Sequence, residues 1–290
     1  MKKVISVPAI LLLLGTLLVG LTAKAQPHFT AKVSGKGSPV IFVHGLYCTG
    51  SVWDETIKRY ASGNECHVLT LAGFGGVEPN LHDNFLESVK ADIINYAREK
   101  KLNKPVIVGH SMGGFLALWA AASEPALFKS VVAVDGLPYF PVLQMPGITP
   151  ESATEMATNM KKGMEDLSPD QTRANQKMYL PSMIADEKNI AIVTEMAAAS
   201  HAPTIAQVMY EMFTTDLRAE VAKIDVPVLL LGSWIAYKNY GVTHDSALAG
   251  YKAQVQSVAK AEVVLSDTAK HFIFYDDPEW FYAQVDRFIR

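Results

Sequence analysis

Short, largely apolar segments, most of which stop at a glycine, recur along this chain and restrict the folds that it can adopt. They are Ser38–Gly45, Cys66–Gly76, Pro105–Gly114, Ser130–Gly136, Val226–Gly232 and Ala261–Asp267. A run of this length without polar alternation is typical of a strand that is buried on both faces. Such strands belong to parallel sheets that helices cover on both sides. We therefore expect an α/β fold with a mostly parallel, doubly wound sheet.

Helical segments are predicted between these strands. Residues 51–62 carry Asp54 and Glu55 in their first turn, as helix starts do. In residues 84–101, apolar side chains recur every three or four positions and form one face of a helix. The other predicted core helices are residues 115–123 and 278–289. Because ligands bind beyond the carboxyl ends of the strands in such sheets, the residues that follow each strand are candidates for a functional site.

The alternation of strands and helices stops between residues 137 and 222. This block is rich in Ala, Met and Glu and contains no convincing strand. We expect a helical cap inserted after the sixth strand, with residues 26–136 and 223–290 forming the core. Most methionines of the chain fall in it: Met145, Met156, Met160, Met164, Met178, Met183, Met196, Met209 and Met212. Because methionine suits adaptable apolar surfaces, this set predicts an apolar substrate pocket.

The first 25 residues have the order of a secretory signal peptide. Two lysines precede an apolar run from Val7 to Leu21, and the small-residue pattern Ala23–Ala25 follows. The apolar run is shorter than the roughly 20 residues that a membrane-spanning helix needs. We expect cleavage after Ala25 and a periplasmic or secreted mature protein without a stable membrane anchor.

The composition indicates which partners to expect. A net charge of −3 without a basic stripe does not favour nucleic-acid binding. No metal-ligand spacing is present, and "GFGG" lacks the context of a dinucleotide site, so neither a metal nor a cofactor is predicted. Cys48 and Cys66 are expected at opposite ends of neighbouring strands, about 17 Å apart. That separation predicts no disulfide between them.

The segment "GHSMG", Gly109–Gly113, fits the pattern G-x-S-x-G. In this motif a serine sits on a sharp turn between a strand and a helix, so small residues must flank it and its hydroxyl is exposed. Here an apolar strand precedes the motif and an apolar helix follows it. Ser111 is therefore the predicted nucleophile, and a structural serine in a tight glycine turn is the alternative.

Four segments, "VHGLYCTGSVW", "GHSMGG", "VVAVDG" and "AKHFIFYDDPEWF", follow one another as they do in proteins of the α/β-hydrolase fold. The chain resembles that family over essentially its whole mature length. A serine hydroxyl needs a base to take its proton, and the resemblance implies His271, shortly after the last strand. His44 is expected to be structural, and His244 in the long loop remains an alternative.

The resemblance also implies an oxyanion hole made of two backbone N–H groups. One comes from Met112, directly after the nucleophile, and the other from Leu46 in the loop after the first "HG" strand. Such donors stabilise the negative oxygen that develops during acyl transfer. Tyr47 and Trp53 are candidates to line the mouth of the pocket and bind substrate, with core packing as the alternative.

A catalytic triad also needs an acid that orients the histidine, and at this position the chain departs from the family pattern. Family members usually carry it after the strand that ends at Gly232, but this chain has no carboxylate there before Asp245. Asp135 is the first choice, because it ends the strand expected beside the nucleophile strand and keeps the order nucleophile, acid, base. Asp245 is the second choice and Asp267 the third.

These residues predict a serine hydrolase that cleaves an ester-type bond, such as a carboxylester, lactone or thioester, in a small to medium apolar substrate. The reaction would pass through an acyl-enzyme. A carbon–carbon bond hydrolase is an alternative on the same scaffold. A non-catalytic ligand-binding protein is another, because the usual loop acid is missing and a fold does not settle function. No motif in the cap specifies the substrate, and the oligomeric state is open.

Overall fold

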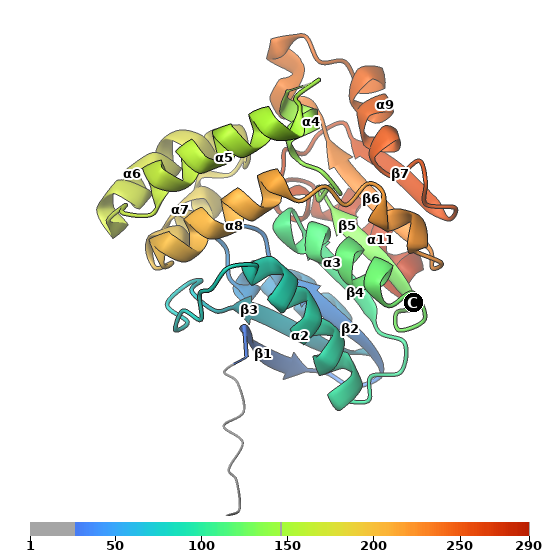
Figure 1. The fold of residues 1–290 in the computed structure, drawn as a ribbon. Coiled ribbons are helices and arrows are strands. Elements are labelled where there is room, and N and C mark those ends of the chain that lie inside the picture. Colours follow the sequence, from blue (N-terminus) through green and yellow to red (C-terminus); the bar gives the residue numbers. More distant parts are fainter. Residues whose placement is uncertain (1–26, 146, 290) are drawn as a thin grey trace, which may run out of the picture.

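The computed structural model describes residues 27–145 and 147–289, so the signal peptide predicted at residues 1–25 lies outside the described residues. In this part of the chain, seven strands form one sheet in the order β1-β3-β2-β4-β5-β6-β7 (Figure 1). The strands are β1 (Phe29–Ser34), β2 (Ser38–Val43), β3 (Asn64–Leu71), β4 (Val106–His110), β5 (Ser130–Val134), β6 (Val228–Ser233) and β7 (Ala261–Ser266). All neighbours pair in parallel except β1 and β3. The predicted mostly parallel sheet is confirmed.

Strand β1 was not predicted from the sequence. It lies at the edge of the sheet and exposes most of its side chains, so "FTAKVS" contains no apolar run. An edge strand needs only one buried face, and a polar segment is compatible with that position.

Successive residues of the inner strands point to opposite faces of the sheet, and both faces are covered. Ile41 and Val43 pack with α2 (Phe85–Glu99), α3 (Met112–Ser123) and α9 (His244–Gln254) in one core. Val40 and Phe42 pack with α1 (Asp54–Tyr60) and α11 (Pro278–Ile289) in the other. This double burial explains why the strand sequences are apolar without alternation.

The segment between β5 and β6 is helical and lies over the carboxyl ends of the strands (Figure 1). It comprises α4 (Pro141–Gln144), α5 (Pro150–Met164), α6 (Pro169–Tyr179), η2 (Leu180–Ser182), α7 (Glu187–Ala198), α8 (Ala202–Thr214) and η3 (Glu220–Lys223). The placement of this cap after the sixth strand was wrong, since it follows the fifth strand that the structure describes. Five strands precede the cap in the described chain: the four predicted apolar strands and the edge strand β1.

Polar residues in the sequence determine where the cap helices begin. The Thr149 hydroxyl accepts a hydrogen bond from the backbone of Ser152 at the start of α5. Ser168 and Gln171 form a reciprocal capping box on α6. Asp186 caps α7 in the same manner as Thr149 caps α5. Each cap supplies an acceptor to an N–H group that has no partner within its helix.

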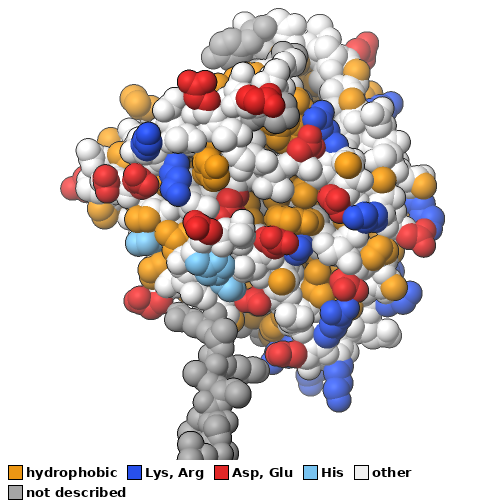
Figure 2. Space-filling model, in the orientation of Figure 1, with side chains coloured by type: hydrophobic (Ala, Val, Ile, Leu, Met, Phe, Trp, Pro, Cys, Tyr) orange, Lys and Arg blue, Asp and Glu red, His pale blue; other side chains and the backbone are white. Residues whose placement is uncertain are grey.

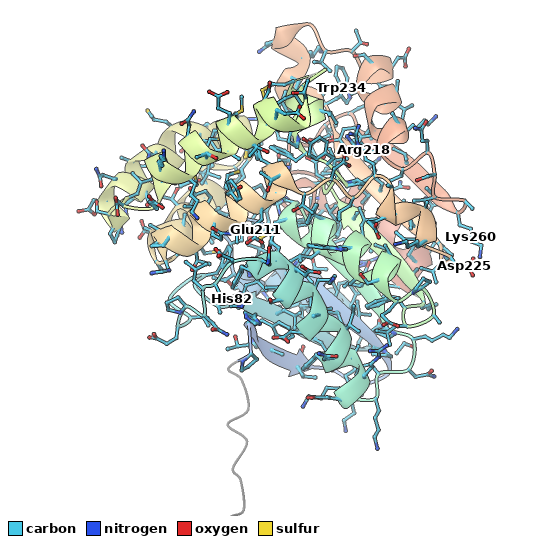
Figure 3. All side chains as sticks on the ribbon, in the orientation of Figure 1. His82, Glu211, Arg218, Asp225, Trp234 and Lys260 are labelled. Atoms are coloured by element: carbon cyan, nitrogen blue, oxygen red, sulfur yellow. The ribbon has the colours of Figure 1, made fainter. Side chains whose placement is uncertain are left out.

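Glu211 joins the cap to the core (Figure 3). This α8 residue is 7% exposed, and its two carboxylate oxygens accept hydrogen bonds from the backbone N–H groups of Phe85 (2.8 Å) and Leu86 (2.7 Å). Phe85 and Leu86 begin α2, whose N-cap residue Asn84 offers no side-chain acceptor. A carboxylate at a helix N-terminus satisfies free donors and interacts favourably with the helix dipole. This contact holds α8 against the core.

The surface and the cysteines add three observations. On the face shown in Figure 2, acidic and basic side chains are interspersed. Several charged side chains of the described chain form ion pairs, such as Arg98 with Glu124. Cys48 and Cys66 are both buried and free, as expected. Among the described residues, no helix combines the length and the apolar character that crossing a membrane requires.

His44, in the turn after β2, is fully buried and holds that turn in place. Its Nδ1 donates to the carbonyl of Gly45 (2.8 Å), and its Nε2 accepts from the N–H of Leu71 (3.1 Å). This pattern requires a neutral ring with its proton on Nδ1. Burial lowers the pKa of His44 to about 4, although the bond to Gly45 opposes the shift. The structure therefore favours the structural role predicted for His44.

The low pKa of His44 predicts a loss of stability in mild acid. A histidine in the unfolded chain titrates near 6.5. Below that pH the unfolded state binds a proton that folded His44 does not bind until about pH 4. The free energy of unfolding should therefore fall as the pH drops from 6.5 to 4, with His44 contributing on the order of 1–3 kcal/mol. Urea denaturation across this range should show a smaller decrease for His44→Gln, whereas His244→Gln, at an exposed site, should match the wild type. Equal slopes for wild type and His44→Gln would contradict the assignment.

Candidate active site

The turn between β4 and α3 carries Ser111 in a conformation that requires glycine neighbours. Ser111 has φ 53° and ψ −117°, in the positive-φ region that most residues avoid. A Cβ on Gly109 would lie 2.0 Å from the carbonyl oxygen of Gly113, and one on Gly113 would lie 2.3 Å from the carbonyl oxygen of Val43. The "GHSMG" motif thus forms the strained elbow that its pattern predicts, and Ser111 faces a cavity.

His271 and Asp135 form a buried pair beside this elbow. His271 follows β7, and its Nδ1 lies 2.6 Å from Oδ2 of Asp135, the residue directly after β5. Their side chains are 14% and 6% exposed. A carboxylate only accepts hydrogen bonds, so Nδ1 is the donor and Nε2 is left free to act as a base. His271 also lines the cavity that Ser111 faces.

Ser111 and His271 make no hydrogen bond with each other in the described part of the chain. Such contacts are often long without substrate and tighten when it binds. The structure brings Ser111 and His271 to one cavity, and it places Asp135 in contact with His271.

The alternative acids and bases lie elsewhere. The side chain of Asp245 is 99% exposed and pairs with His244 at 3.3 Å. Asp267 accepts a hydrogen bond from Nε1 of Trp234 (3.0 Å). Neither aspartate contacts His271. The geometry thus favours Asp135 over the second and third choices.

His110 lies against the ring of His271, with 4.6 Å between the ring centroids. Its Nε2 lies 3.2 Å from the backbone carbonyl of His271, which the ring NH can donate to. Burial, with the neighbouring His271 as a smaller cause, lowers the pKa of His110 well below its usual value. A neutral ring in this position supports the loop that carries His271.

Ser233 and Tyr251 complete the surroundings of Asp135, and sequence reasoning missed both. The Ser233 hydroxyl donates to Oδ2 of Asp135 (3.0 Å), its backbone N–H donates to Oδ1 (3.3 Å), and the Tyr251 hydroxyl also donates to Oδ1. Burial and the charge of Asp135 raise the pKa of Tyr251 well above its usual value, so it stays a donor. Gly232 leaves room for the tyrosine, since a Cβ there would lie 2.4 Å from its ring.

The two missed residues left different traces in the sequence. Ser233 ends β6, at the position after which the family usually carries its acid, so a polar residue there was a usable signal. Tyr251 lies in α9, 18 residues further along, and only the packing of α9 against the sheet brings it to the site.

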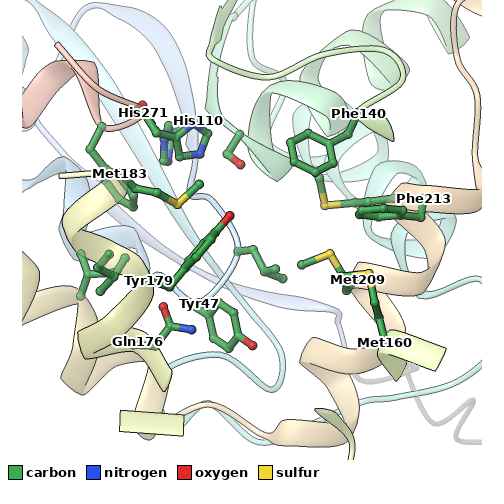
Figure 4. A pocket seen from close by; sticks show the side chains of 16 residues that line it. Tyr47, His110, Phe140, Met160, Gln176, Tyr179, Met183, Met209, Phe213 and His271 are labelled. Atoms are coloured by element: carbon green, nitrogen blue, oxygen red, sulfur yellow. Dashed lines mark hydrogen bonds between the residues drawn. The ribbon is translucent and has the colours of Figure 1, made fainter. Parts of the chain in front are cut away.

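The cavity in front of Ser111 is narrow and mostly apolar (Figure 4). Its volume is about 120 Å³. Its lining consists of Leu46, Tyr47, His110, Ser111, Phe140, Met160, Gln176, Tyr179, Leu180, Met183, Val193, Met209, Met212, Phe213, His271 and Phe272. Four of these residues belong to the cap methionines that predicted an apolar pocket, whereas Met178 is 80% exposed.

The structure separates the residues expected to bind substrate. Tyr47 lines the cavity. The expectation that Trp53 lines the pocket mouth was wrong. Its side chain is fully buried in the core that packs with α1 and α11, and it is not among the residues that line the cavity. Its ring packs against Phe274 and Phe42, with centroids 4.5 and 5.6 Å apart. A large apolar ring is stabilised more by that core than by a pocket mouth.

Of the two expected oxyanion donors, Leu46 lines the cavity, whereas Met112 is buried directly after Ser111. Met112 is the first residue of α3, so its N–H has no acceptor within the helix. Leu46 lies in the loop after β2 and lines the cavity, next to Tyr47, whose φ of 63° marks the sharp bend of that loop. Among the described residues, no group of three or more His, Cys, Asp or Glu side chains could hold a metal ion.

The sequence matches the Alpha/beta hydrolase family over residues 40–284. The chain belongs to this family. Pimeloyl-(acyl-carrier protein) methyl ester esterase of Vibrio cholerae is 25% identical over 259 residues, which cover 89% of this chain and 96% of that esterase. This membership confirms the predicted fold and the prediction that the protein is a hydrolytic enzyme.

Solved structures show the same fold at lower sequence identity. The hydrolase resembles the enol-lactonase from Burkholderia xenovorans with a TM-score of 0.71 and 17% identity, over 90% of this chain and 96% of the lactonase. It resembles an esterase from Exiguobacterium antarcticum with a TM-score of 0.73 and 16% identity, over 90% and 95% of the two chains.

The hydrogen bond from the Tyr251 hydroxyl to Asp135 predicts that Tyr251 affects the reactivity of Ser111. In Tyr251→Phe the carboxylate of Asp135 loses one of its hydrogen-bond donors, so Asp135 and the His271 ring that it holds are positioned less firmly. The rate of fluorophosphonate labelling of Ser111 should fall about fivefold, as expected for one hydrogen bond. The measurement is the labelling rate of wild type and variant at one fixed pH.

Tyr60→Phe is the matched control for this prediction. The Tyr60 hydroxyl also donates to a carboxylate, that of Asp286 (2.7 Å), but far from the cavity. This variant should keep the wild-type labelling rate. An equal labelling rate in Tyr251→Phe and the wild type would show that the Tyr251 hydroxyl has no influence on the reactivity of Ser111.

Proposed function

We propose that this protein is an exported serine hydrolase that cleaves an ester-type bond in a small to medium, mostly apolar substrate. Ser111 attacks the carbonyl carbon while His271 takes the hydroxyl proton. Asp135 orients His271 and stabilises its charged form. The N–H groups of Met112 and Leu46 donate to the oxyanion. His271 then returns the proton to the leaving group, activates water, and the acyl-enzyme is hydrolysed.

One observation carries this proposal: His271 joins Asp135 to the cavity that Ser111 faces. A hydrogen bond of 2.6 Å from Nδ1 to Asp135 holds the His271 ring, and His271 and Ser111 both line the cavity. A protein that only binds a ligand has no use for a strained serine beside an oriented histidine. This arrangement favours catalysis over the non-catalytic alternative.

The cavity and the relatives support the class of bond. The lining is dominated by methionine and aromatic side chains, which suit an apolar acyl or alkyl group. The relatives include a methyl ester esterase, an enol-lactonase and an esterase. A carboxylester or lactone is therefore the proposed substrate, and a thioester would use the same groups.

Active-site labelling tests the triad. Wild-type Ser111 should react rapidly with a fluorophosphonate, detected by mass spectrometry of the labelled peptide. Asp135→Asn should slow labelling by about 10³- to 10⁴-fold, because the amide favours the wrong ring tautomer. Asp267→Asn and Asp245→Asn are matched controls and should stay within about twofold of the wild type.

Two results would contradict the triad. Equal labelling of wild type and Asp135→Asn would remove Asp135 from it. If the wild type failed to react where a control esterase does, the protein would be a ligand-binding member of the family rather than an active hydrolase.

Export rests on the signal-peptide pattern of residues 1–25. The proposed location is the periplasm or the medium. Expression of the full chain in a bacterium, followed by cell fractionation and intact-mass measurement, should yield a protein that begins at Gln26 outside the cytoplasm. Retention of Met1–Ala25 on a cytoplasmic protein would contradict this part of the proposal.

A further inference from the structure

Gln176 is a buried polar side chain that faces the cavity without a partner. The residue is 5% exposed, and within the part of the chain that the structure describes its amide makes no hydrogen bond. The amide is not one of the side-chain groups that the described chain encloses completely without a partner, so its polar atoms open onto the cavity. Gln176 therefore offers a donor and an acceptor to a molecule that occupies the cavity.

The helix that carries Gln176 gives a second, independent indication. A helix on a protein surface normally buries its apolar face. In α6 the two buried side chains are Thr172 and Gln176, one turn apart, whereas Met178 at the end of the helix is 80% exposed. Leu180 and Val193 line the same cavity as Gln176, so an apolar side chain at this position would be compatible with the lining. The amide at this position indicates a ligand that pairs with it.

The surroundings define the chemistry of that ligand. Gln176 lies across the cavity from His271, with Tyr47 and Tyr179 nearby (Figure 4). Among the described residues that line the cavity, none is Asp, Glu, Lys or Arg. Burial, with Tyr179 as a smaller cause, raises the pKa of Tyr47 to about 12, so its hydroxyl is also neutral. A charged group in this space would lose its hydration without gaining a counter-ion.

We infer that Gln176 is a specificity residue, which binds a neutral hydrogen-bonding group on the substrate chain that fills the cavity. A ketone, hydroxyl or amide fits, because the side chain offers both a donor and an acceptor. The inference rests on the proposed ester hydrolysis and narrows it to neutral esters or lactones with a second polar group away from the reacting carbonyl. A purely alkyl chain would leave the amide unpaired in the bound state, which is how a polar site rejects an apolar analogue.

A matched series of esters tests this inference. The probes are p-nitrophenyl heptanoate and its 4-oxo, 5-oxo and 6-oxo derivatives, which differ only in the position of a neutral carbonyl. For the wild type, kcat/KM should be about tenfold higher for at least one oxo ester than for the heptanoate. Gln176→Leu should reduce this preference to within about twofold, chiefly by gaining activity on the heptanoate.

Thr172→Val is the control, because it removes the other buried polar group of α6, which does not line this cavity, and it should keep the wild-type preference. A circular dichroism spectrum and a melting temperature close to those of the wild type would show that Gln176→Leu is folded. Gln176→Met serves as a second variant. An unchanged preference in both Gln176 variants, or a wild type that prefers no oxo ester, would overturn the inference and leave the esterase activity standing. Loss of both labelling and turnover in the wild type would instead overturn the proposed function, and this inference with it.

Discussion

The carboxylate of Asp135 is the group on which the arrangement of the site depends. A buried carboxylate is stable only where hydrogen-bond donors surround it. Here the donors come from three segments that are far apart in the sequence: Ser233 at the end of β6, Tyr251 in α9, and His271 after β7. These contacts draw the three segments together at the carboxyl ends of β5, β6 and β7. They also explain why the loop after β6 needs no acid, since β6 contributes donors to an acid that stands on β5.

The parallel sheet provides the second constraint. Hydrogen bonding between neighbouring strands continues just past their ends, because the N–H of Ser111 donates to Val134 (2.8 Å) and that of Asp135 donates to Leu231 (2.7 Å). Both residues are therefore held by backbone contacts in addition to their side-chain interactions. Both also have positive φ, so each turns sharply away from its strand toward the cap side. The site sits where parallel strands commonly place ligands.

The cap determines what can reach these groups. Its methionines and aromatic residues provide most of the lining, and Glu211 fixes α8 to the first turn of α2. Gln176 and Tyr179 are the cap residues with polar groups in this mostly apolar lining. The core thus carries Ser111, His271 and Asp135, whereas the cap provides most of the lining of the space before them.

The sequence by itself determined the parallel sheet, the elbow at Ser111 and the helical character of the cap, because apolar runs and glycine motifs are local patterns, and its family resemblance indicated His271. It also ranked Asp135 first among three acids, from its place at a strand end. It could not decide that Trp53 lies in the core, that β1 completes the sheet edge, or that Tyr251 and Gln176 face the site. Those outcomes depend on which helix packs on which surface, and that is decided by contacts between residues far apart in the chain, which the tertiary structure alone brings together.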